Sequence, residues 1–246
     1  MINKEVLKET AKRKGLINKE HIEKDYFQDL LLFNIYKQTN LFVFKGGTAL
    51  YKVYNLNRFS EDLDFSLLED LNAEENIRKA LENIKDAKIK DSKKIKDSIL
   101  IKIMFKGIIT RYNTVRVDIN LKNPILEKFD IKTYTPSYID INPFSLRILN
   151  LKEMVAEKFH SILNRESARD LYDLFFLLKF VELDKPLIVK KLSRFKLSFD
   201  YKDLKERIEN LENLWKKELK PFILSELPDF EPVKIFVLNK LERLRG

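Results

Sequence analysis

Apolar positions recur with two different spacings along this chain, and the change between them falls near residue 145. Before that point, segments with an apolar residue at every third or fourth position alternate with short apolar or alternating runs, which are the patterns of helices and strands. After it, nearly every segment has the helical spacing. We therefore predict an α/β (α+β) domain with N-terminal helices over residues 1–144 and a C-terminal helical domain over residues 145–246.

The elements of the first domain follow from these patterns. Helices are expected at residues 3–14, 18–38, 48–54 and 72–87. Strands are expected at residues 41–44, 58–67, 98–109 and 114–121. In the second domain, Asn150 and Glu153 have the capping-box spacing that begins a helix.

Four segments are expected to connect these elements. Residues 111–113 are interpreted as a hairpin turn, and the Asn123-Pro124 pair and residues 136–143 as loops. Residues 88–96 are rich in lysine, which is compatible with a solvated loop and equally with a segment that touches a phosphate backbone.

Composition excludes several classes of protein. With no cysteine and two histidines, the chain has no disulfides and no thiol chemistry, and a zinc site is not expected. No apolar run reaches the ~20 residues of a membrane span, and the N-terminus lacks a signal-peptide core, so we expect a cytoplasmic protein without a membrane partner. The net charge of +9 favours a polyanionic partner, although a lysine-rich proteome, such as a thermophile's, would produce the same excess.

Two of the expected strands carry aspartates on their polar face. Asp62 and Asp64 alternate with apolar residues in one strand, and Asp118 alternates with them in the other. Such carboxylates repel one another unless a cation lies between them, and magnesium prefers oxygen ligands. If the two strands are neighbours, the three aspartates would hold two metal ions roughly 3.5–4 Å apart. The alternative is an ordinary solvated face, although aspartate is uncommon in strands.

A glycine pair lies upstream of these aspartates, between an expected strand and an expected helix. Gly46 and Gly47 are two of only five glycines, and Thr48 follows them. Glycine lets backbone N–H groups approach a phosphate, and a helix N-terminus attracts anions. The segment is neither a Walker loop nor a dinucleotide fingerprint, and a simple tight turn is its other interpretation.

Together these motifs resemble the signature of the AbiEii/AbiGii toxin family of nucleotidyltransferases. The segments that carry the resemblance are Glu23-Lys24-Asp25-Tyr26, Phe44-Lys45-Gly46-Gly47-Thr48-Ala49-Leu50, Arg58-Phe59-Ser60-Glu61-Asp62-Leu63-Asp64-Phe65-Ser66, Ala156-Glu157-Lys158, and Arg165 with Arg169-Asp170-Leu171-Tyr172-Asp173-Leu174. The resemblance spans roughly residues 20–180, and the last 60 or so residues add little to it.

The resemblance implies a polymerase-β-like core with a small mixed sheet, followed by a helical bundle. Asp62 and Asp64 would bind two Mg²⁺ ions, with Mn²⁺ as a substitute, and Asp118 would complete the site. The residues expected to bind the NTP are Gly46, Gly47, Thr48, Arg58, Ser60 and Lys158. The family also implies the 3′ end of tRNA, or another RNA, as acceptor and a cognate AbiEi-like antitoxin as partner, in a type IV-like toxin–antitoxin or abortive-infection system.

Lys158 interrupts the apolar stripe of a helix expected over residues 151–163. A lysine at such a position either extends to water or meets a negative partner. The resemblance makes Lys158 and Asp170 a second pair of catalytic residues. From its position alone, Asp170 could orient Lys158 or accept a proton, whereas Asp173 is expected to be structural.

Two other functions fit the same sequence. The enzyme could modify a hydroxyl of a protein or small molecule instead of RNA. Alternatively, the chain could be a catalytically silent nucleic-acid-binding module that keeps the fold, in which case replacing Asp62 would change no activity.

Overall fold

A computed structural model of the chain describes residues 2–69, 72–122 and 125–244. The chain forms two compact units. The sheet unit consists of Met1–Asn55, Phe59–Ile125 and Phe129–Ile148. The helical unit consists of Leu56–Arg58, Leu126–Lys128 and Leu149–Gly246. Two short segments that precede residue 145 therefore belong to the helical unit, which no local pattern in the sequence indicates.

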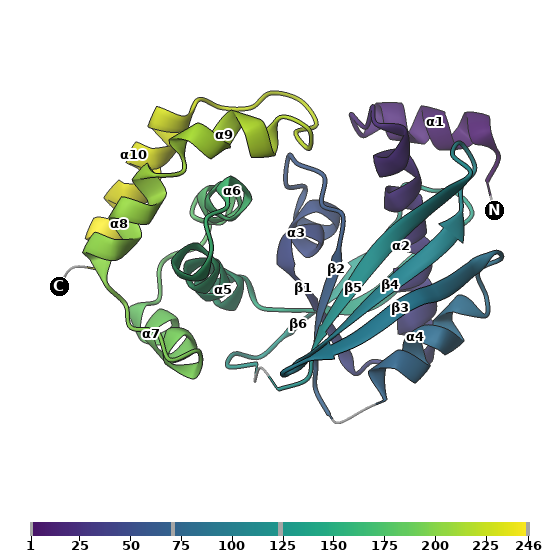
Figure 1. The fold of residues 1–246 in the computed structure, drawn as a ribbon, viewed down its shortest axis with the longest axis horizontal. Coiled ribbons are helices and arrows are strands. Elements are labelled where there is room, and N and C mark those ends of the chain that lie inside the picture. The colour runs from purple at the N-terminus through teal and green to yellow at the C-terminus, as the bar shows by residue number, and fades with distance from the viewer. Residues whose placement is uncertain (1, 70–71, 123–124, 245–246) are drawn as a thin grey trace. The chain divides into compact units, whose positions relative to one another are not determined.

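Among the described residues, the sheet has seven strands in the spatial order β3-β4-β5-β2-β1-β7-β6 (Figure 1). The strands are β1 (Phe42–Lys45), β2 (Leu63–Leu67), β3 (Ala87–Ile95), β4 (Ser98–Lys106), β5 (Tyr112–Asn120), β6 (Asp130–Tyr134) and β7 (Phe144–Ile148). The pairs β2–β5 and β1–β7 are parallel and the other neighbours are antiparallel. The expected α/β class with a mixed sheet is thus confirmed.

Helices cover one face of this sheet. The helices of the sheet unit are α1 (Lys4–Arg13), α2 (Lys19–Gln38), α3 (Gly46–Tyr54) and α4 (Ala73–Leu81). In Figure 1, α2 and α4 lie behind β3, β4 and β5. Ile101, Ile103 and Phe105 of β4 point to this covered side and are buried, and the ring of Phe27 stacks on Phe105 at 4.0 Å between centroids. The core of the sheet unit therefore lies between these helices and the sheet.

Buried ion pairs fix α2 against α3. The Lys52 ammonium lies 2.8 Å from an Asp25 carboxylate oxygen and 2.7 Å from one of Asp29, and all three side chains are fully buried. Lys14, just after α1, pairs with the same Asp25 at 2.5 Å. Burial raises the pKa of Asp25, but the charges of Lys14 and Lys52 hold that pKa well below its usual value. The network holds α3, the helix that begins at Gly46, in a defined place.

The helical unit begins with a capped helix. Its helices are α5 (Leu151–Asn164), α6 (Ala168–Leu177), α7 (Lys185–Arg194), α8 (Tyr201–Glu209), α9 (Glu212–Leu219) and α10 (Phe230–Glu242). Asn150 caps α5 by accepting the backbone N–H of Lys152. Glu153 instead accepts the backbone N–H of Leu126 and pairs with Lys191 at 2.7 Å. The Glu153 carboxylate therefore attaches the short segment 126–128 to the helical unit.

The structure corrects several sequence-based expectations. Residues 88–96 are not a loop, because they form most of strand β3 at the edge of the sheet. The turn after β4 lies at residues 107–111 and not at 111–113, since the buried Glu23 carboxylate accepts the backbone N–H groups of Ile109 and Thr110 and holds the turn there.

Other differences concern where elements begin and end. Strand β2 begins at Leu63 and not at residue 58, and α4 ends at Leu81 and not at residue 87. Strands β6 and β7 flank the expected loop at residues 136–143. The loop expected at Asn123-Pro124 lies outside the described residues. Within the described part of the chain, no helix combines the length and the apolar character needed to cross a bilayer.

Candidate active site

Strand pairing brings two of the predicted aspartates next to each other. Strand β2 runs parallel to β5, and Asp64 is the register partner of Asp118. Their neighbours Leu63 and Val117 are fully buried on the helix-covered side, so Asp64 and Asp118 share the opposite face. Neighbouring strands are about 4.8 Å apart, which places the two carboxylates within reach of a common ligand.

Gly46 is shaped to the Asp64 carboxylate. Strand β1 ends at Lys45, which is in register with Asp64 on the other side of β2. The backbone of Gly46 has φ +74°, and a β-carbon built there would collide with the Asp64 carboxylate. Only glycine meets both conditions. The N-terminus of α3 therefore begins directly beside this carboxylate.

Thr48 holds the segment that carries Asp62. Its buried hydroxyl donates a hydrogen bond to the backbone carbonyl of Asp62. The turn from β1 into α3 is thus connected to the start of β2. Gly46, Gly47 and Thr48 lie in the first turn of α3. Their binding of an NTP stays a prediction, as does that of Ser60.

Helix α2 fixes the loop that precedes the aspartates. The side-chain amide of Gln28 donates to the backbone carbonyls of both Ser60 and Glu61, each at 2.9 Å. The Lys24 ammonium lies 2.6 Å from the Glu61 carboxylate. Gln28 and Lys24 of α2 thus hold this loop, the first through its backbone and the second through the Glu61 side chain.

Cations next to the site adjust its electrostatics. Burial raises the pKa of Asp118 above its usual value, the charge of Lys45 opposes this, and the charge of Asp62 raises the pKa further. Arg116 donates two hydrogen bonds to Asp62, one of them from Nε at 3.1 Å. The three carboxylates therefore belong to one charged cluster, with Lys45 and Arg116 at its border.

The donor set fits a divalent cation. Asp64 and Asp118 offer hard oxygen ligands at adjacent positions, and the pKa of Asp118 is raised first by burial and then by the charge of Asp62, both of which a bound cation would oppose. As the side chains lie, no three acidic, histidine or cysteine residues of the described chain surround a common metal position. The Asp62 carboxylate is turned to Arg116, from which it accepts two hydrogen bonds.

The helical unit contains a second cluster, and this one is buried. The Lys158 ammonium lies 2.9 Å from Asp170 and 2.6 Å from Asp173. Arg58 donates two hydrogen bonds of 2.7 Å to Asp173, and Arg165 donates to Asp170. The structure therefore brings together the predicted pair Lys158 and Asp170. It also places Arg58 with Asp173, and the binding of an NTP by Arg58 stays a prediction.

Charges within this cluster stabilise one another. Burial lowers the pKa of Lys158, but the carboxylates of Asp173 and Asp170 raise it above its usual value. Burial raises the pKa of Asp170, yet the charges of Lys158 and Arg165 hold it well below its usual value. Lys158 is therefore a permanent cation and Asp170 a permanent anion near neutral pH.

Sequence reasoning missed four side chains that support the site, namely Lys24, Gln28, Lys45 and Arg116. Arg116 could have been found, because it lies two residues before Asp118 on the same face of the strand. Lys24 and Gln28 contact Ser60 and Glu61, which are more than 30 positions away in the chain, so no local sequence pattern predicts these contacts.

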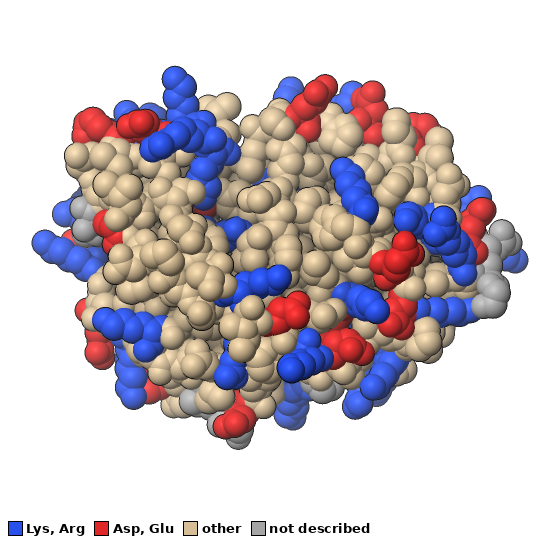
Figure 2. Space-filling view, turned by 180° about the vertical axis from the view of Figure 1, so that it is seen from behind, with Lys and Arg blue, Asp and Glu red and all other residues tan. Residues whose placement is uncertain are grey.

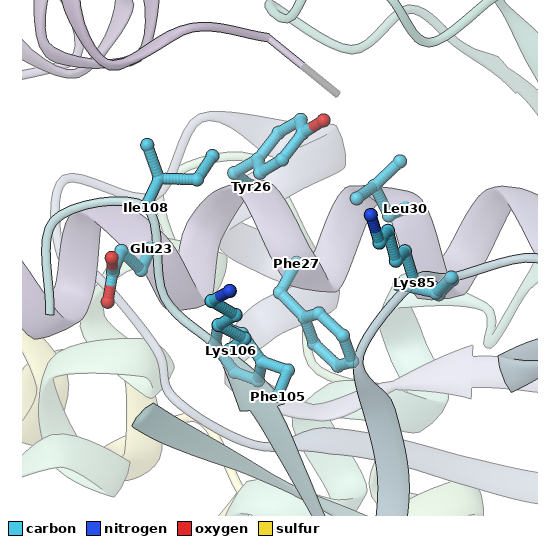
Figure 3. A pocket seen from close by; sticks show the side chains of 9 residues that line it. Glu23, Tyr26, Phe27, Leu30, Lys85, Phe105, Lys106 and Ile108 are labelled. Atoms are coloured by element: carbon cyan, nitrogen blue, oxygen red, sulfur yellow. The ribbon is translucent and has the colours of Figure 1, made fainter. Parts of the chain in front are cut away.

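A small pocket in the sheet unit lies away from these residues. Figure 3 shows its lining, which comes from α2, from β4 and from the segments that follow α4 and β4. Phe105 points into it, and since Phe105 is on the helix-covered side, the pocket is on the opposite face of the sheet from Asp118. It contains none of the predicted site residues.

Known proteins share both the sequence pattern and the fold. The family model "Nucleotidyl transferase AbiEii toxin, Type IV TA system" matches residues 30–234. The crystal structure of JHP933 from Helicobacter pylori is similar at 20% identity, with a TM-score of 0.59 and 93% of each chain covered. MenT4, a nucleotidyltransferase toxin from Mycobacterium tuberculosis H37Rv, is similar at 21% identity, with a TM-score of 0.65 and coverage of 95% of this chain and 87% of MenT4. Among curated proteins, none matches the chain in sequence.

The matched range contains the glycine pair, the three aspartates and the Lys158 cluster, and the two solved structures have the same fold. This chain therefore belongs to the AbiEii nucleotidyl transferase toxin family and is a nucleotidyltransferase.

Proposed function

We propose that the enzyme transfers a nucleoside monophosphate from an NTP to an acceptor hydroxyl, with the 3′ end of tRNA as the acceptor. The observation that carries the proposal is the parallel register of Asp64 with Asp118, beside a glycine shaped to the Asp64 carboxylate. Carboxylates of neighbouring strands next to the N-terminus of a helix suit a metal-bound triphosphate.

The reaction forms one phosphorus–oxygen bond, breaks another and removes the proton of the acceptor hydroxyl. The acceptor oxygen attacks the α-phosphorus of the NTP, the bond from that phosphorus to the β-phosphate oxygen breaks, pyrophosphate leaves, and the hydroxyl proton is released to solvent. Asp62, Asp64 and Asp118 would hold two Mg²⁺ ions, or Mn²⁺ in their place. When bound, such ions lower the barrier by neutralising the attacking and leaving oxygens.

The chain's own residues would position the substrate. Backbone N–H groups at the N-terminus of α3, from Gly46 onward, would face the phosphates. Asp62 would exchange Arg116 for the cation, since that ion pair is exposed and therefore weak. The freed Arg116 guanidinium would then be available to a phosphate.

Lys158 and Asp170 would act as the second catalytic pair. Lys158 stays charged because two carboxylates surround it, so it can offset phosphate charge in the transition state. Asp170 would orient it through their 2.9 Å hydrogen bond. We further propose a cytoplasmic location, from the composition of the chain, and a cognate antitoxin as partner, from the family to which the chain belongs.

Incubation with labelled NTPs, total tRNA and a protein extract tests the proposal. We expect label to appear in tRNA, and Asp62→Ala to reduce its rate on the order of 10²-fold or more, the scale of a lost electrostatic stabiliser. Asp203→Ala is the matched control, because Asp203 also pairs with an exposed arginine, Arg207 at 2.8 Å, but lies in the helical unit on α8.

Each other outcome selects a different function. Label that enters only protein or small molecules would exclude tRNA as the acceptor. A rate that Asp62→Ala leaves unchanged would contradict the catalytic assignment of the carboxylates. Absence of any transfer by the unaltered chain, together with binding to nucleic acid, would indicate a silent binding module.

A further inference from the structure

The face of the sheet that carries Asp64 and Asp118 continues as a basic surface over β5, β4 and β3. Residues on this side alternate with the buried residues that face α2 and α4. We call this side the open face, and define its basic part by Lys88, Lys93, Lys102 and Arg116. In Figure 1, β3, β4 and β5 lie in front of α2 and α4, so the open face is turned toward the viewer.

Strand register places these four cations close together. Lys102 of β4 is the partner of Arg116 in β5, which puts their α-carbons about 5 Å apart. Lys88 and Lys93 of β3 are opposite Met104 and Leu100, one alternation to either side of Lys102, and the acidic Asp91 is opposite Lys102 itself. Such diagonal neighbours are roughly 7–8 Å apart. The four charges therefore form one patch, with long side chains that can adjust to a flexible partner.

The patch is exposed and is neutralised in part, by Asp91 within it and by Asp62 at its border. The side chains of Lys93 and Arg116 are 68% and 64% exposed. Lys93 pairs with Asp91 at 3.6 Å and Arg116 pairs with Asp62, whereas Lys88 and Lys102 form no ion pair with any described residue. On the opposite side of the molecule, shown in Figure 2, basic and acidic side chains are intermixed.

The basic patch is continuous with the active-site carboxylates. Leu100 lies between Lys93 and Asp118 in one cross-strand row, and Arg116 contacts Asp62 directly. A chain molecule lying over the patch would thus end beside Asp118. Tyr112, on the same face of β5, is 56% exposed and offers a ring on which a base can stack.

We infer that the open face binds the phosphate backbone of a single-stranded RNA segment and leads its 3′ end to the carboxylates. Lysines that follow a backbone, together with an exposed aromatic ring, are the features that bind single strands without reading sequence. The choice of RNA over other polyanions rests on the proposed function. The location rests on charge, exposure and strand register.

Binding of a 5′-fluorescein-labelled single-stranded RNA of about 12 nucleotides tests the inference by anisotropy at several salt concentrations. The test variant combines Lys88→Gln, Lys93→Gln and Lys102→Gln. The control combines Lys190→Gln, Lys202→Gln and Lys216→Gln, which removes the same charge from exposed lysines of the helical unit. We expect the test variant to bind on the order of 10-fold more weakly, with a log K against log salt slope shallower by about 2.

The outcomes separate this inference from the proposed function. Equal losses in both triple variants, or no loss in the test variant, would overturn the open face as the binding surface, even if the unaltered enzyme transfers nucleotides to RNA. Competition by polyglutamate as effective as that by unlabelled RNA at equal charge would assign the face to an acidic protein. Specific loss of RNA binding in an enzyme that labels no RNA would support the surface and contradict the proposed acceptor.

Discussion

Two arginine–aspartate pairs with the same geometry occur in different surroundings in this protein. Arg116 and Asp62 in the sheet unit, and Arg58 and Asp173 in the helical unit, each share hydrogen bonds from Nε and from a terminal nitrogen. The side chains of the first pair are 64% and 33% exposed, whereas those of the second are 5% and 0% exposed. Burial is thus the main difference between them.

Because of this difference in burial, the two ion pairs differ in how easily they can separate. An exposed ion pair contributes about 0–1 kcal/mol, because water solvates the separated charges almost as well. Asp62 can therefore exchange its partner at little cost. A buried carboxylate that loses its partners has no such alternative, so Asp173 acts as a fixed support for Arg58 and Lys158. We conclude that the changeable charges of this enzyme are on the open face of the sheet and the permanent ones in the helical unit.

The largest effect on stability is expected for Asp173→Asn. The substitution leaves Arg58 without its buried counter-charge and weakens that of Lys158, so the free energy of unfolding should fall by about 3–5 kcal/mol. Urea titration measures it. Asp203→Asn, which removes an exposed pair with Arg207, is the control and should cost less than about 1 kcal/mol.

The pH dependence of this loss identifies its cause. Burial raises the pKa of Asp173, but Arg58 and Lys158 lower it below the usual value. A lowered carboxyl pKa stabilises the folded state fully above the unfolded pKa of about 3.9, and this contribution is lost as the pH falls toward the folded pKa. The gap between the unaltered chain and Asp173→Asn should therefore be constant down to about pH 5 and narrow below about pH 4. A gap of the same size at all pH values would indicate a packing defect instead.

A smaller effect on stability is expected for Gly46→Ala. The positive φ should cost about 1–2 kcal/mol, and the new methyl group should displace the Asp64 carboxylate. Because a displaced catalytic group can cost on the order of 10²-fold in rate, transfer activity should fall by that amount. Gly15→Ala is the matched control, since Gly15 also has positive φ, +76°, but lies at the end of α1. Gly15→Ala should retain full transfer activity. If Gly46→Ala retained it as well, the contact of Gly46 with Asp64 would have no role in the reaction.

The smallest effect on stability is expected for Arg116→Gln. Its pair with Asp62 is exposed, so the free energy of unfolding should change by less than about 1 kcal/mol in urea titration. A loss comparable to that of Asp173→Asn would show that geometry and not burial determines the strength of these pairs. The comparison between the two clusters would then be wrong.

Local patterns in the sequence were sufficient for several parts of the site. The alternation of Asp64 and Asp118 with apolar residues places each of these two carboxylates on the polar face of its strand, because a pleated strand has a period of two. Asp62, which the same pattern assigns to a strand, lies just before β2. Likewise, the position of Lys158 within an apolar stripe predicts that it either extends to water or meets a negative partner, and the structure shows the second with Asp170 and Asp173. The spacing of apolar residues also distinguishes the sheet-containing part from the helical part.

The spacing of apolar residues does not predict the edge strand β3. Its lysines alternate poorly with apolar residues, because none of its side chains is fully buried, although α4 packs against the strand. Only pairing with β4 makes this segment a strand. A helix or strand can be predicted from the spacing of its apolar residues only when it has at least one continuous apolar face.

The sequence alone determined which side chains could be charged, buried or turned to a common face. Tertiary structure decided which of them meet: Asp64 with Asp118 across parallel strands, and Arg58 with Asp173 across 115 positions of the chain. The reason is that periodicity is a property of neighbouring residues, whereas strand order and the choice of ion-pair partners depend on how distant segments pack to bury their apolar faces.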